Sequence, residues 1–301
     1  MEVFVPKYYE KFKCIAERCT HSCCVGWEID VDEKTFARHD ASEHPLSREL
    51  LSVTSECDGV KYIELCESGR CPFLDGCGLC RIISELGEEY TSRICREHPR
   101  FYHRIGERVE CGIGAVCEEA ASIILSSDCY DSFVKISREA CDTASGDECA
   151  LIHRSEIFTL LRSHSLSDAV ASICEKYGIN ITALSGQRIS DAVAELELLD
   201  EGHRDMLAKV SFSFSSFTEE YLKRFLAYLV FRHVSVSESE DMIAARVAFS
   251  LLLLGIFSGN ICEPCECDFR RAADVARIIS EEIEYSEENI DALIFELYSL
   301  M

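Results

Sequence analysis

Basic residues are scarce in this sequence of 301 residues: 30 Lys and Arg stand against 54 Asp and Glu, a net charge of −24 at pH 7. Proteins that bind nucleic acid neutralise phosphates with Lys and Arg, so this balance argues against a nucleic-acid binder. It favours a neutral or basic partner instead. The hydrophobic content of 48% is sufficient for a sizeable core, in one large domain or two small ones.

The sequence pattern predicts neither a secretory signal nor a membrane-spanning helix. Residues 1–11 are interrupted by charge and contain no apolar core followed by small residues at a cleavage site. The longest apolar run, Val247 to Phe257, is about half of the roughly 20 residues that a membrane helix needs, and Arg246 precedes it directly. We therefore expect a cytoplasmic protein without membrane association, in which this run forms a buried helix.

Cysteine, in contrast, is abundant and unevenly distributed. Of the 19 cysteines, 12 lie in residues 1–120 and seven in the remaining 181. An odd number of cysteines, two of them adjacent at Cys23 and Cys24, makes a poor disulfide framework for a cytoplasmic chain. We expect metal or redox chemistry in the front part of the chain.

The spacing of glycines and of apolar residues also changes along the sequence. Glycines punctuate residues 1–120, which indicates turns and short elements: a helix over Phe36 to Leu51 and extended segments over Val60–Leu65 and Arg108–Cys111. Residues 121–301 show apolar residues three and four apart, which is typical of helices. The prediction is a mainly α fold, in which an irregular cysteine-rich metal-binding N-terminal module with short strands, residues 1–120, packs on an α-helical domain, residues 121–301.

Two groups of front cysteines have spacings suited to chelation. The first group consists of Cys14, Cys19, Cys23 and Cys24. Cys19 and Cys23 are four residues apart and share one face of a helical turn, while a bend at Gly26 can bring further thiols alongside. The second group consists of Cys71, Cys77, Cys80 and Cys95. Cys77 and Cys80 are separated by two residues, the spacing with which two thiolates reach one metal centre.

The donor type restricts the metal, but the spacing does not decide it. Thiolates suit zinc or iron–sulfur clusters, whereas calcium and magnesium prefer oxygen ligands. The irregular spacings fit neither a standard zinc finger nor a standard ferredoxin run. The remaining thiols include ordinary buried core residues, the candidates being Cys57, Cys66, Cys111, Cys129, Cys141, Cys149 and Cys174. A third group, Cys262, Cys265 and Cys267, has only three ligands and is more typical of a surface loop.

Several motifs occur together in a recognisable order. They are Phe12-x-Cys14-x4-Cys19-x3-Cys23-Cys24-x2-Trp27-x-Ile29-Asp30, Cys71-Pro72-Phe73-Leu74, Gly78-Leu79-Cys80-x-Ile82, Cys95-x2-His98-Pro99-Arg100 and Cys117-Glu118-Glu119-Ala120. With these motifs the sequence resembles the flagellin lysine-N-methylase family, and weaker similarity extends through the helical half. His98 replaces an aromatic residue of many relatives, and Cys77 is additional.

The resemblance implies a protein lysine N-methyltransferase that uses S-adenosylmethionine and carries a four-iron, four-sulfur cluster. It also implies a lysine-bearing protein as methyl acceptor, with flagellin as the family's example. We expect the metal ligands to come from Cys14, Cys19, Cys23, Cys24, Cys71, Cys80 and Cys95, most of which should converge on one centre. Four thiolates suffice for one cubane cluster.

Methyl transfer to lysine requires the neutral amine, yet free lysine has a pKa of about 10.4. An aromatic surface that desolvates the amine and a carboxylate that accepts its proton would overcome this. Trp27, Asp30 and Asp32, which follow the first cysteine group, are the candidates. The alternative is that Asp30 and Asp32 only cap a helix that begins near Glu33.

The binding site for S-adenosylmethionine is less visible. No GxGxxG motif opens a strand–helix unit, and Gly112-Ile113-Gly114 lacks that context. Arg100, in the Pro-Arg motif, is our candidate for binding the methionine carboxylate or balancing a cluster's negative charge, because guanidinium groups match carboxylates. A different class of function stays open: a non-enzymatic zinc- or iron-binding module that docks a basic protein.

Overall fold

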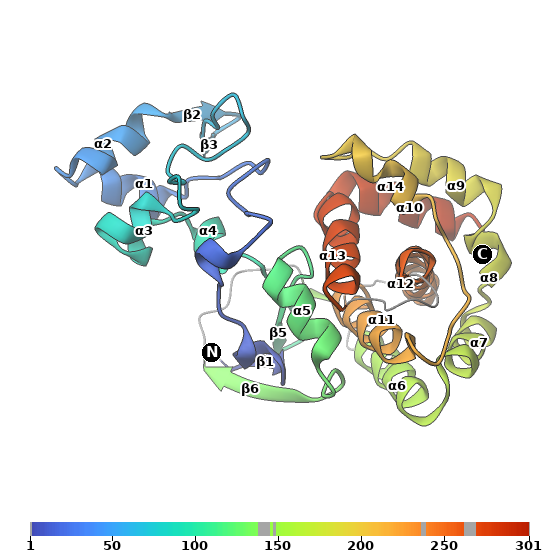
Figure 1. Ribbon diagram of the computed structural model, residues 1–301. Coiled ribbons are helices and arrows are strands. Elements are labelled where there is room, and N and C mark those ends of the chain that lie inside the picture. The colour runs from blue at the N-terminus through green and yellow to red at the C-terminus, as the bar shows by residue number, and fades with distance from the viewer. Residues whose placement is uncertain (1, 138–144, 147–148, 236–238, 262–268, 301) are drawn as a thin grey trace. The chain divides into compact units, whose positions relative to one another are not determined.

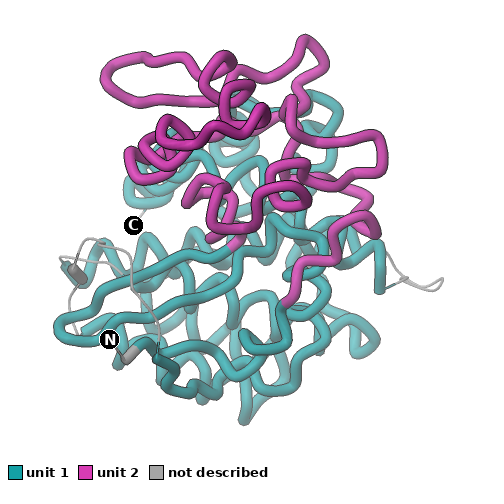
Figure 2. Tube along the Cα trace, turned by 90° about the vertical axis from the view of Figure 1, so that its left-hand side faces the viewer, with its two compact units in different colours: residues 1–12, 100–301 teal, residues 13–99 magenta. Residues whose placement is uncertain are grey.

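The computed structural model describes residues 2–137, 145–146, 149–235, 239–261 and 269–300. The described chain is mainly α-helical, with 56% helix and 12% strand, so the predicted fold class is confirmed in its secondary structure. Two compact units are present (Figure 2). Unit 1 comprises residues 1–12 and 100–301, and unit 2 comprises the intervening residues 13–99.

Unit 1 contains a five-stranded sheet of order β6-β1-β5-β4-β7, which explains why the first residues fold with the distant helical part. Its strands are β1 (Glu2–Pro6), β4 (Arg100–Ile105), β5 (Arg108–Ile113), β6 (Phe133–Ser137) and β7 (Ser145–Gly146). β1 pairs in parallel with β5 and antiparallel with β6. The extended segment expected over Arg108–Cys111 lies within β5. The unit boundaries therefore fall at residues 12/13 and 99/100. The sequence pattern instead places the boundary between the two predicted domains at residue 120.

The helices of unit 1 surround one long apolar helix, α12 (Figure 1). Around it lie α6 (Cys149–Ser163), α7 (Leu166–Tyr177), α8 (Ile181–Leu184), α9 (Gln187–Ala194), α10 (Arg204–Leu207), α11 (Glu219–His233), α13 (Phe269–Ile279) and α14 (Glu287–Tyr298). α5 (Glu118–Ser126) packs against α11 and α13.

α12 spans Glu240–Asn260 and is long and apolar enough to cross a membrane by length and composition alone. Its Val247–Phe257 run is buried, however, and 72% of its most apolar stretch lies inside the protein. The buried helix expected from this run is therefore confirmed.

Unit 2 is built from short elements around a small core. Its helices are η2 (Ala16–Arg18), α1 (Glu33–Asp40), α2 (Pro45–Ser52), α3 (Arg81–Leu86), η3 (Glu88–Tyr90) and α4 (Arg93–Glu97), and its hairpin consists of β2 (Thr54–Cys57) and β3 (Val60–Ile63). The buried apolar side chains of this core are Ile29, Val31, Leu46, Leu50, Ile63, Cys71, Phe73 and Ile82.

One helix predicted in unit 2 is wrong, because the structure has two helices in its place. The single helix predicted over Phe36 to Leu51 is divided into α1 and α2. Pro45 causes the break, because its ring removes a backbone donor and disfavours helical geometry in the preceding residue. It occupies the first turn of α2, where the missing N–H does no harm. The extended segment expected from Val60 is confirmed as β3.

A buried carboxylate joins three elements of unit 1. Glu284 lies at the end of the π-helix η5 (Ser280–Glu284) and accepts a hydrogen bond from the Tyr228 hydroxyl at 2.9 Å, while the imidazole of His233 lies 2.6 Å away. Tyr228 in turn accepts a bond from the Ala115 N–H at 3.0 Å. Burial raises the pKa of Glu284, but Arg232 and His233 outweigh it and lower the pKa to about 2.

The lowered pKa of Glu284 predicts an acid-sensitive fold. A carboxyl with an ordinary pKa of 4.5 when unfolded and about 2 when folded stabilises the protein fully above about pH 5. This stabilisation is lost as the pH falls towards 2. Glu284→Gln should lower the free energy of unfolding at pH 7 by about 3–5 kcal/mol, because it leaves buried positive charge unpaired.

Urea denaturation between pH 7 and pH 2 measures both effects. The matched control is Glu296→Gln, which removes only a partly exposed ion pair with Arg188 and should cost less than about 1 kcal/mol. Glu284→Gln should also show a shallower loss of stability in acid than the unsubstituted protein. An unchanged slope would refute the assigned contribution of Glu284.

Candidate metal centre in unit 2

Backbone pairing brings Cys24 and Cys71 together. The Cys71 N–H donates to the Cys24 carbonyl at 2.8 Å, and the Gly26 N–H donates to the Gly69 carbonyl at 2.8 Å. Both glycines have positive φ angles, +79° at Gly26 and +72° at Gly69, which side-chain-bearing residues rarely adopt. The two segments that carry the first and second cysteine groups are therefore held side by side.

The loop after Cys71 turns back on itself and places Cys80 on the same core. Leu74 forms an antiparallel bridge with Cys80. The turn between them is closed by Asp75, whose side chain accepts hydrogen bonds from the N–H groups of Cys77 and Leu79, both at 2.8 Å. Cys80 then occupies the N-cap position of α3. Cys71 is buried in the core of unit 2, and the side chains of Cys24 and Cys80 pack against that core.

Cys95 is positioned through α4, which is anchored to α1 by Asp32. One carboxylate oxygen of Asp32 accepts from the Thr35 N–H at 3.1 Å and thereby caps α1. The other oxygen accepts from the Arg93 N–H at 2.8 Å, at the start of α4. Burial raises the pKa of Asp32, but the hydrogen bonds from Arg93 and Thr35 outweigh it, so the net shift is downward.

Four thiols lie close enough for their charges to interact with one another, Cys24, Cys71, Cys80 and Cys95, and the exposed Cys66 also acts on Cys71. Burial raises the pKa of Cys71 to about 11, and repulsion by thiolates at Cys24 and Cys80 adds to it. Burial raises the pKa of Cys95 to about 12, and repulsion by thiolates at Cys24, Cys80 and Cys71 adds to it. Because Cys95 also keeps contact with solvent, water screens part of this repulsion.

Cys24 differs from the other three thiols. A hydrogen bond with the Cys23 side chain lowers its pKa to about 7 against the effect of burial, and Ser22 and Arg70 contribute in the same direction. One thiolate is thus available near neutral pH, while the three neighbouring thiols hold their protons. A bound cation would remove the mutual repulsion and favour all four thiolates together. By donor type, four thiolates suit either a tetrahedral zinc ion or a four-iron, four-sulfur cluster.

The remaining predicted ligands lie in the same unit. Cys14 is exposed in the loop before η2, and Cys19 follows η2, where its thiol donates to the His21 carbonyl at 2.9 Å. Cys23 is exposed beside Cys24. The ligand roles of Cys14, Cys19 and Cys23 stay predictions.

The predicted catalytic residues follow this centre along the chain. Asp30 is exposed on an extended segment that pairs with β3 through a bridge to Tyr62, and Trp27 is half-buried three residues earlier. Asp32 is the N-cap of α1, which begins at Glu33, so the predicted cap is confirmed for this residue. A catalytic role for any of the three stays a prediction.

Arg100, the predicted cofactor ligand, belongs to unit 1 and begins β4. Its Nε donates to the Tyr9 hydroxyl at 2.9 Å, and its guanidinium lies 5.8 Å from the centre of the Tyr9 ring and 5.4 Å from that of Phe12. These contacts fix the orientation of the guanidinium. Local sequence patterns do not predict these contacts, because Tyr9 lies 91 residues from Arg100 along the chain.

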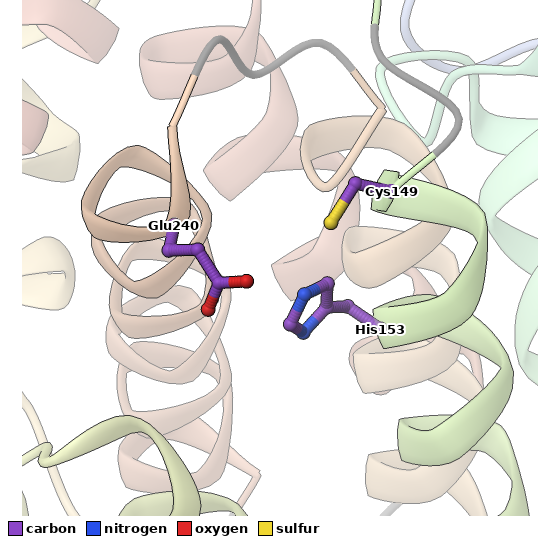
Figure 3. Close-up of side chains that lie close together, drawn as sticks. All are labelled: Cys149, His153 and Glu240. Atoms are coloured by element: carbon purple, nitrogen blue, oxygen red, sulfur yellow. The ribbon is translucent and has the colours of Figure 1, made fainter.

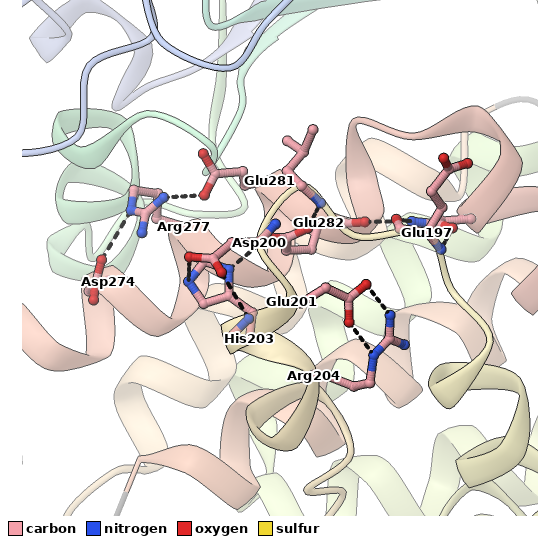
Figure 4. A network of polar contacts seen from close by, with 12 residues as sticks. Glu197, Asp200, Glu201, His203, Arg204, Asp274, Arg277, Glu281 and Glu282 are labelled. Carbon is pink, nitrogen blue, oxygen red and sulfur yellow. Dashed lines mark hydrogen bonds and ion pairs between the residues drawn. The ribbon is translucent and has the colours of Figure 1, made fainter. Parts of the chain in front are cut away.

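A second polar cluster, in unit 1, has a structural role (Figure 4). Glu282 is buried and accepts hydrogen bonds from the N–H groups of Leu199 at 2.7 Å and Asp200 at 3.1 Å, and its carboxylate lies 2.6 Å from His203 Nδ1. The neighbouring Glu281 pairs with Arg277. The carboxylates of this cluster are engaged by protein donors, and the cluster joins the loop before α10 to η5.

Comparison with known proteins finds similarity over part of the chain. The chain is 29% identical over 127 residues to a lysine-N-methylase of Salmonella typhimurium strain LT2, which is 40% of this chain and 32% of that protein. It is also 29% identical over 127 residues to the flagellar biosynthetic protein FliU of Salmonella muenchen, 75% of which is covered. The match thus spans about a third of the length of the lysine-N-methylase. No family model and no solved structure matches the chain.

The small core of unit 2 predicts a regional effect of thiol loss. Cys80→Ser should accelerate amide exchange in residues 13–99 by at least about tenfold, equivalent to about 1.4 kcal/mol, and leave unit 1 largely unchanged. Hydrogen exchange followed by mass spectrometry resolves the two units. Cys57→Ser, at the exposed end of β2, is the matched control and should have little effect. Equal loss of protection in both units would contradict a metal centre confined to unit 2.

Proposed function

We propose that this protein is a protein-lysine N-methyltransferase that uses S-adenosylmethionine and holds a four-iron, four-sulfur cluster in unit 2. The similarity to proteins named lysine-N-methylase is the observation that carries the activity. The group formed by Cys24, Cys71, Cys80 and Cys95 supports the cofactor, since these four thiols are the donors that such a cluster requires. When bound, the cluster supplies redox-active, electrophilic iron.

The proposed reaction transfers one methyl group between two heteroatoms. The lysine Nζ attacks the sulfonium methyl group, the carbon–sulfur bond breaks, and S-adenosylhomocysteine leaves as a neutral thioether. The amine must lose a proton, and its pKa in water is about 10.4. Trp27 is our candidate for the surface that desolvates the amine, and Asp30, exposed two residues before α1's N-cap, is our candidate for the proton acceptor.

Two further residues have narrower roles in this proposal. Asp32 positions α1 and α4, and its lowered pKa makes it a weak base. Arg100 is our candidate for the methionine carboxylate of S-adenosylmethionine. Tyr9 and Phe12 hold its guanidinium in one orientation, which suits bidentate recognition of a planar carboxylate.

The alternative is a non-enzymatic protein-interaction module stabilised by zinc. Four thiolates suit zinc as well as an iron–sulfur cluster, so the donor set alone favours neither. The two functions differ in the metal and in the use of S-adenosylmethionine.

Anaerobic purification followed by metal analysis should find about four iron and four sulfide per chain. The protein should transfer labelled methyl groups from S-adenosylmethionine to lysine side chains, with flagellin as the first acceptor to test because one relative is named a flagellar biosynthetic protein. Cys71→Ser should abolish cluster binding and reduce transfer at least about 100-fold, whereas Cys57→Ser should retain both. Colourless protein with one zinc ion and no transfer would establish the alternative.

The acidic surface of unit 1 suits a lysine-rich acceptor. Unit 1 carries a net charge of −17, against −7 for unit 2. A groove of about 700 Å³ lies between α9 and α14, with apolar side chains such as Leu196 and Phe295 and a rim that includes Glu195, Glu197 and Glu288. We propose that a lysine-rich segment of the acceptor docks there, because its apolar and basic groups complement this lining.

This docking predicts a salt-sensitive encounter. At subsaturating acceptor, methylation should slow as ionic strength rises, because charges more than about 8–10 Å apart are screened. Turnover at saturation should change little. Glu195→Gln combined with Glu197→Gln should raise the KM for the acceptor several-fold and flatten its salt dependence.

Glu43→Gln combined with Glu107→Gln is the matched control, since it removes the same charge at exposed positions outside the groove. It should leave the KM nearly unchanged. Equal effects of both double variants would mean that net charge, and not the groove, governs the encounter. A rate that does not depend on salt would remove the basis for electrostatic steering altogether.

A further inference from the structure

Three side chains of unit 1 bring a sulfur, a nitrogen and an oxygen ligand together. The ligand atoms of Cys149, His153 and Glu240 all lie within 4.8 Å of one another. Cys149 and His153 are four residues apart at the start of α6 and therefore occupy the same face of that helix. Glu240 is the first residue of α12. Figure 3 shows the thiol, the imidazole and the carboxylate pointing toward one another.

The imidazole of this triad is held in place by a hydrogen bond that suits a metal ligand. His153 Nδ1 lies 2.8 Å from the hydroxyl oxygen of Tyr177, the last residue of α7. When Nδ1–H donates to this oxygen, the lone pair of Nε2 is available for a metal. Metal-binding histidines are commonly oriented in this way by a partner on the second nitrogen.

The charges beside the triad are partly compensated. Lys176 forms an ion pair with Glu156 and lies 5.5 Å from the centre of the Tyr177 ring, whereas Glu240 has no ion-pair partner in the described part of the chain. The second group of three potential ligands, His203, Glu281 and Glu282, differs because backbone N–H groups and Arg277 occupy its carboxylates.

We propose that Cys149, His153 and Glu240 bind one Zn²⁺ ion, with water in the fourth position of a tetrahedral site. Mixed sulfur, nitrogen and oxygen ligands suit zinc, whereas calcium and magnesium require oxygen. Ligand atoms around tetrahedral zinc are roughly 3–4 Å apart, so small side-chain rotations complete the geometry.

Such an ion would connect the first turns of α6 and α12. The site is chemically separate from the four thiols of unit 2 and does not depend on the proposed methyltransferase activity. It leaves one coordination position open to water, as in zinc sites that interact with further ligands.

The test uses the full chain with its unit 2 cofactor loaded, stripped of loosely bound metal by a chelator. Titration with Co²⁺ as a spectroscopic probe, and then competition by Zn²⁺, should show one tetrahedral thiolate-bound ion in this site. Glu240→Gln should weaken binding at least about tenfold, and Cys149→Ser combined with His153→Gln should remove it. Tyr177→Phe keeps all three ligands and should weaken binding about 10–100-fold by freeing the imidazole.

The matched control is Cys174→Ser combined with His164→Gln, which removes one thiol and one imidazole from α7 and the end of α6 without touching the triad. It should bind Co²⁺ as the unsubstituted protein does. In hydrogen exchange, Zn²⁺ should protect the first turns of α6 and α12 in the control but not in Glu240→Gln. Because Glu240 is exposed, this variant should fold even if the double variant does not. Equal stoichiometry and affinity in the unsubstituted protein and Glu240→Gln would overturn the proposal.

Discussion

The close grouping of four thiols is the constraint on which the architecture of unit 2 depends. Cys24, Cys71, Cys80 and Cys95 cannot all ionise without a compensating positive charge. Three local features hold them together: the backbone pairing of Gly26 with Gly69, the turn closed by Asp75, and the hydrogen bonds that Asp32 accepts from α1 and α4. Hydrogen bonds thus maintain an arrangement that opposes the joint ionisation of the thiols.

The two units obtain their stability in different ways. Unit 2 has a core of eight buried side chains, one of which is itself a thiol. Unit 1 packs its helices around α12 and can accommodate buried charge, as the contacts of Glu284 with Tyr228 and His233 show. A region with a small core benefits most from a metal, because the ion replaces contacts that the polypeptide does not provide.

The sequence predicts local features of this fold well. The buried helix around Val247 and the cap at Asp32 follow from apolar composition and capping chemistry, both of which act over a few residues. The helix expected over Phe36 to Leu51 fails because Pro45 outweighs the apolar spacing. The pairing of β1 with β5 and β6 could not be predicted, since no local signal encodes contacts between segments more than a hundred residues apart.

The same distinction applies to the candidate sites. Motif spacing identifies the cysteine groups of unit 2, but the convergence of Cys24 with Cys71 and Cys80 depends on loop geometry that spacing does not specify. Cys149 was expected only as a core thiol. Its proximity to His153 is visible in the sequence as a helical repeat, whereas the approach of Glu240 depends on the tertiary structure, which brings the start of α12 near the start of α6.

The insertion of residues 13–99 between β1 and β4 has a consequence for biosynthesis. β1 leaves the ribosome first, but its partners β5 and β6 are not made until after the whole of unit 2. Unit 2 is a continuous segment and can fold while β1 still lacks its sheet. Folding of unit 2 and assembly of the central sheet are therefore separable in time, and binding of the metal that we propose for unit 2 does not have to wait for unit 1.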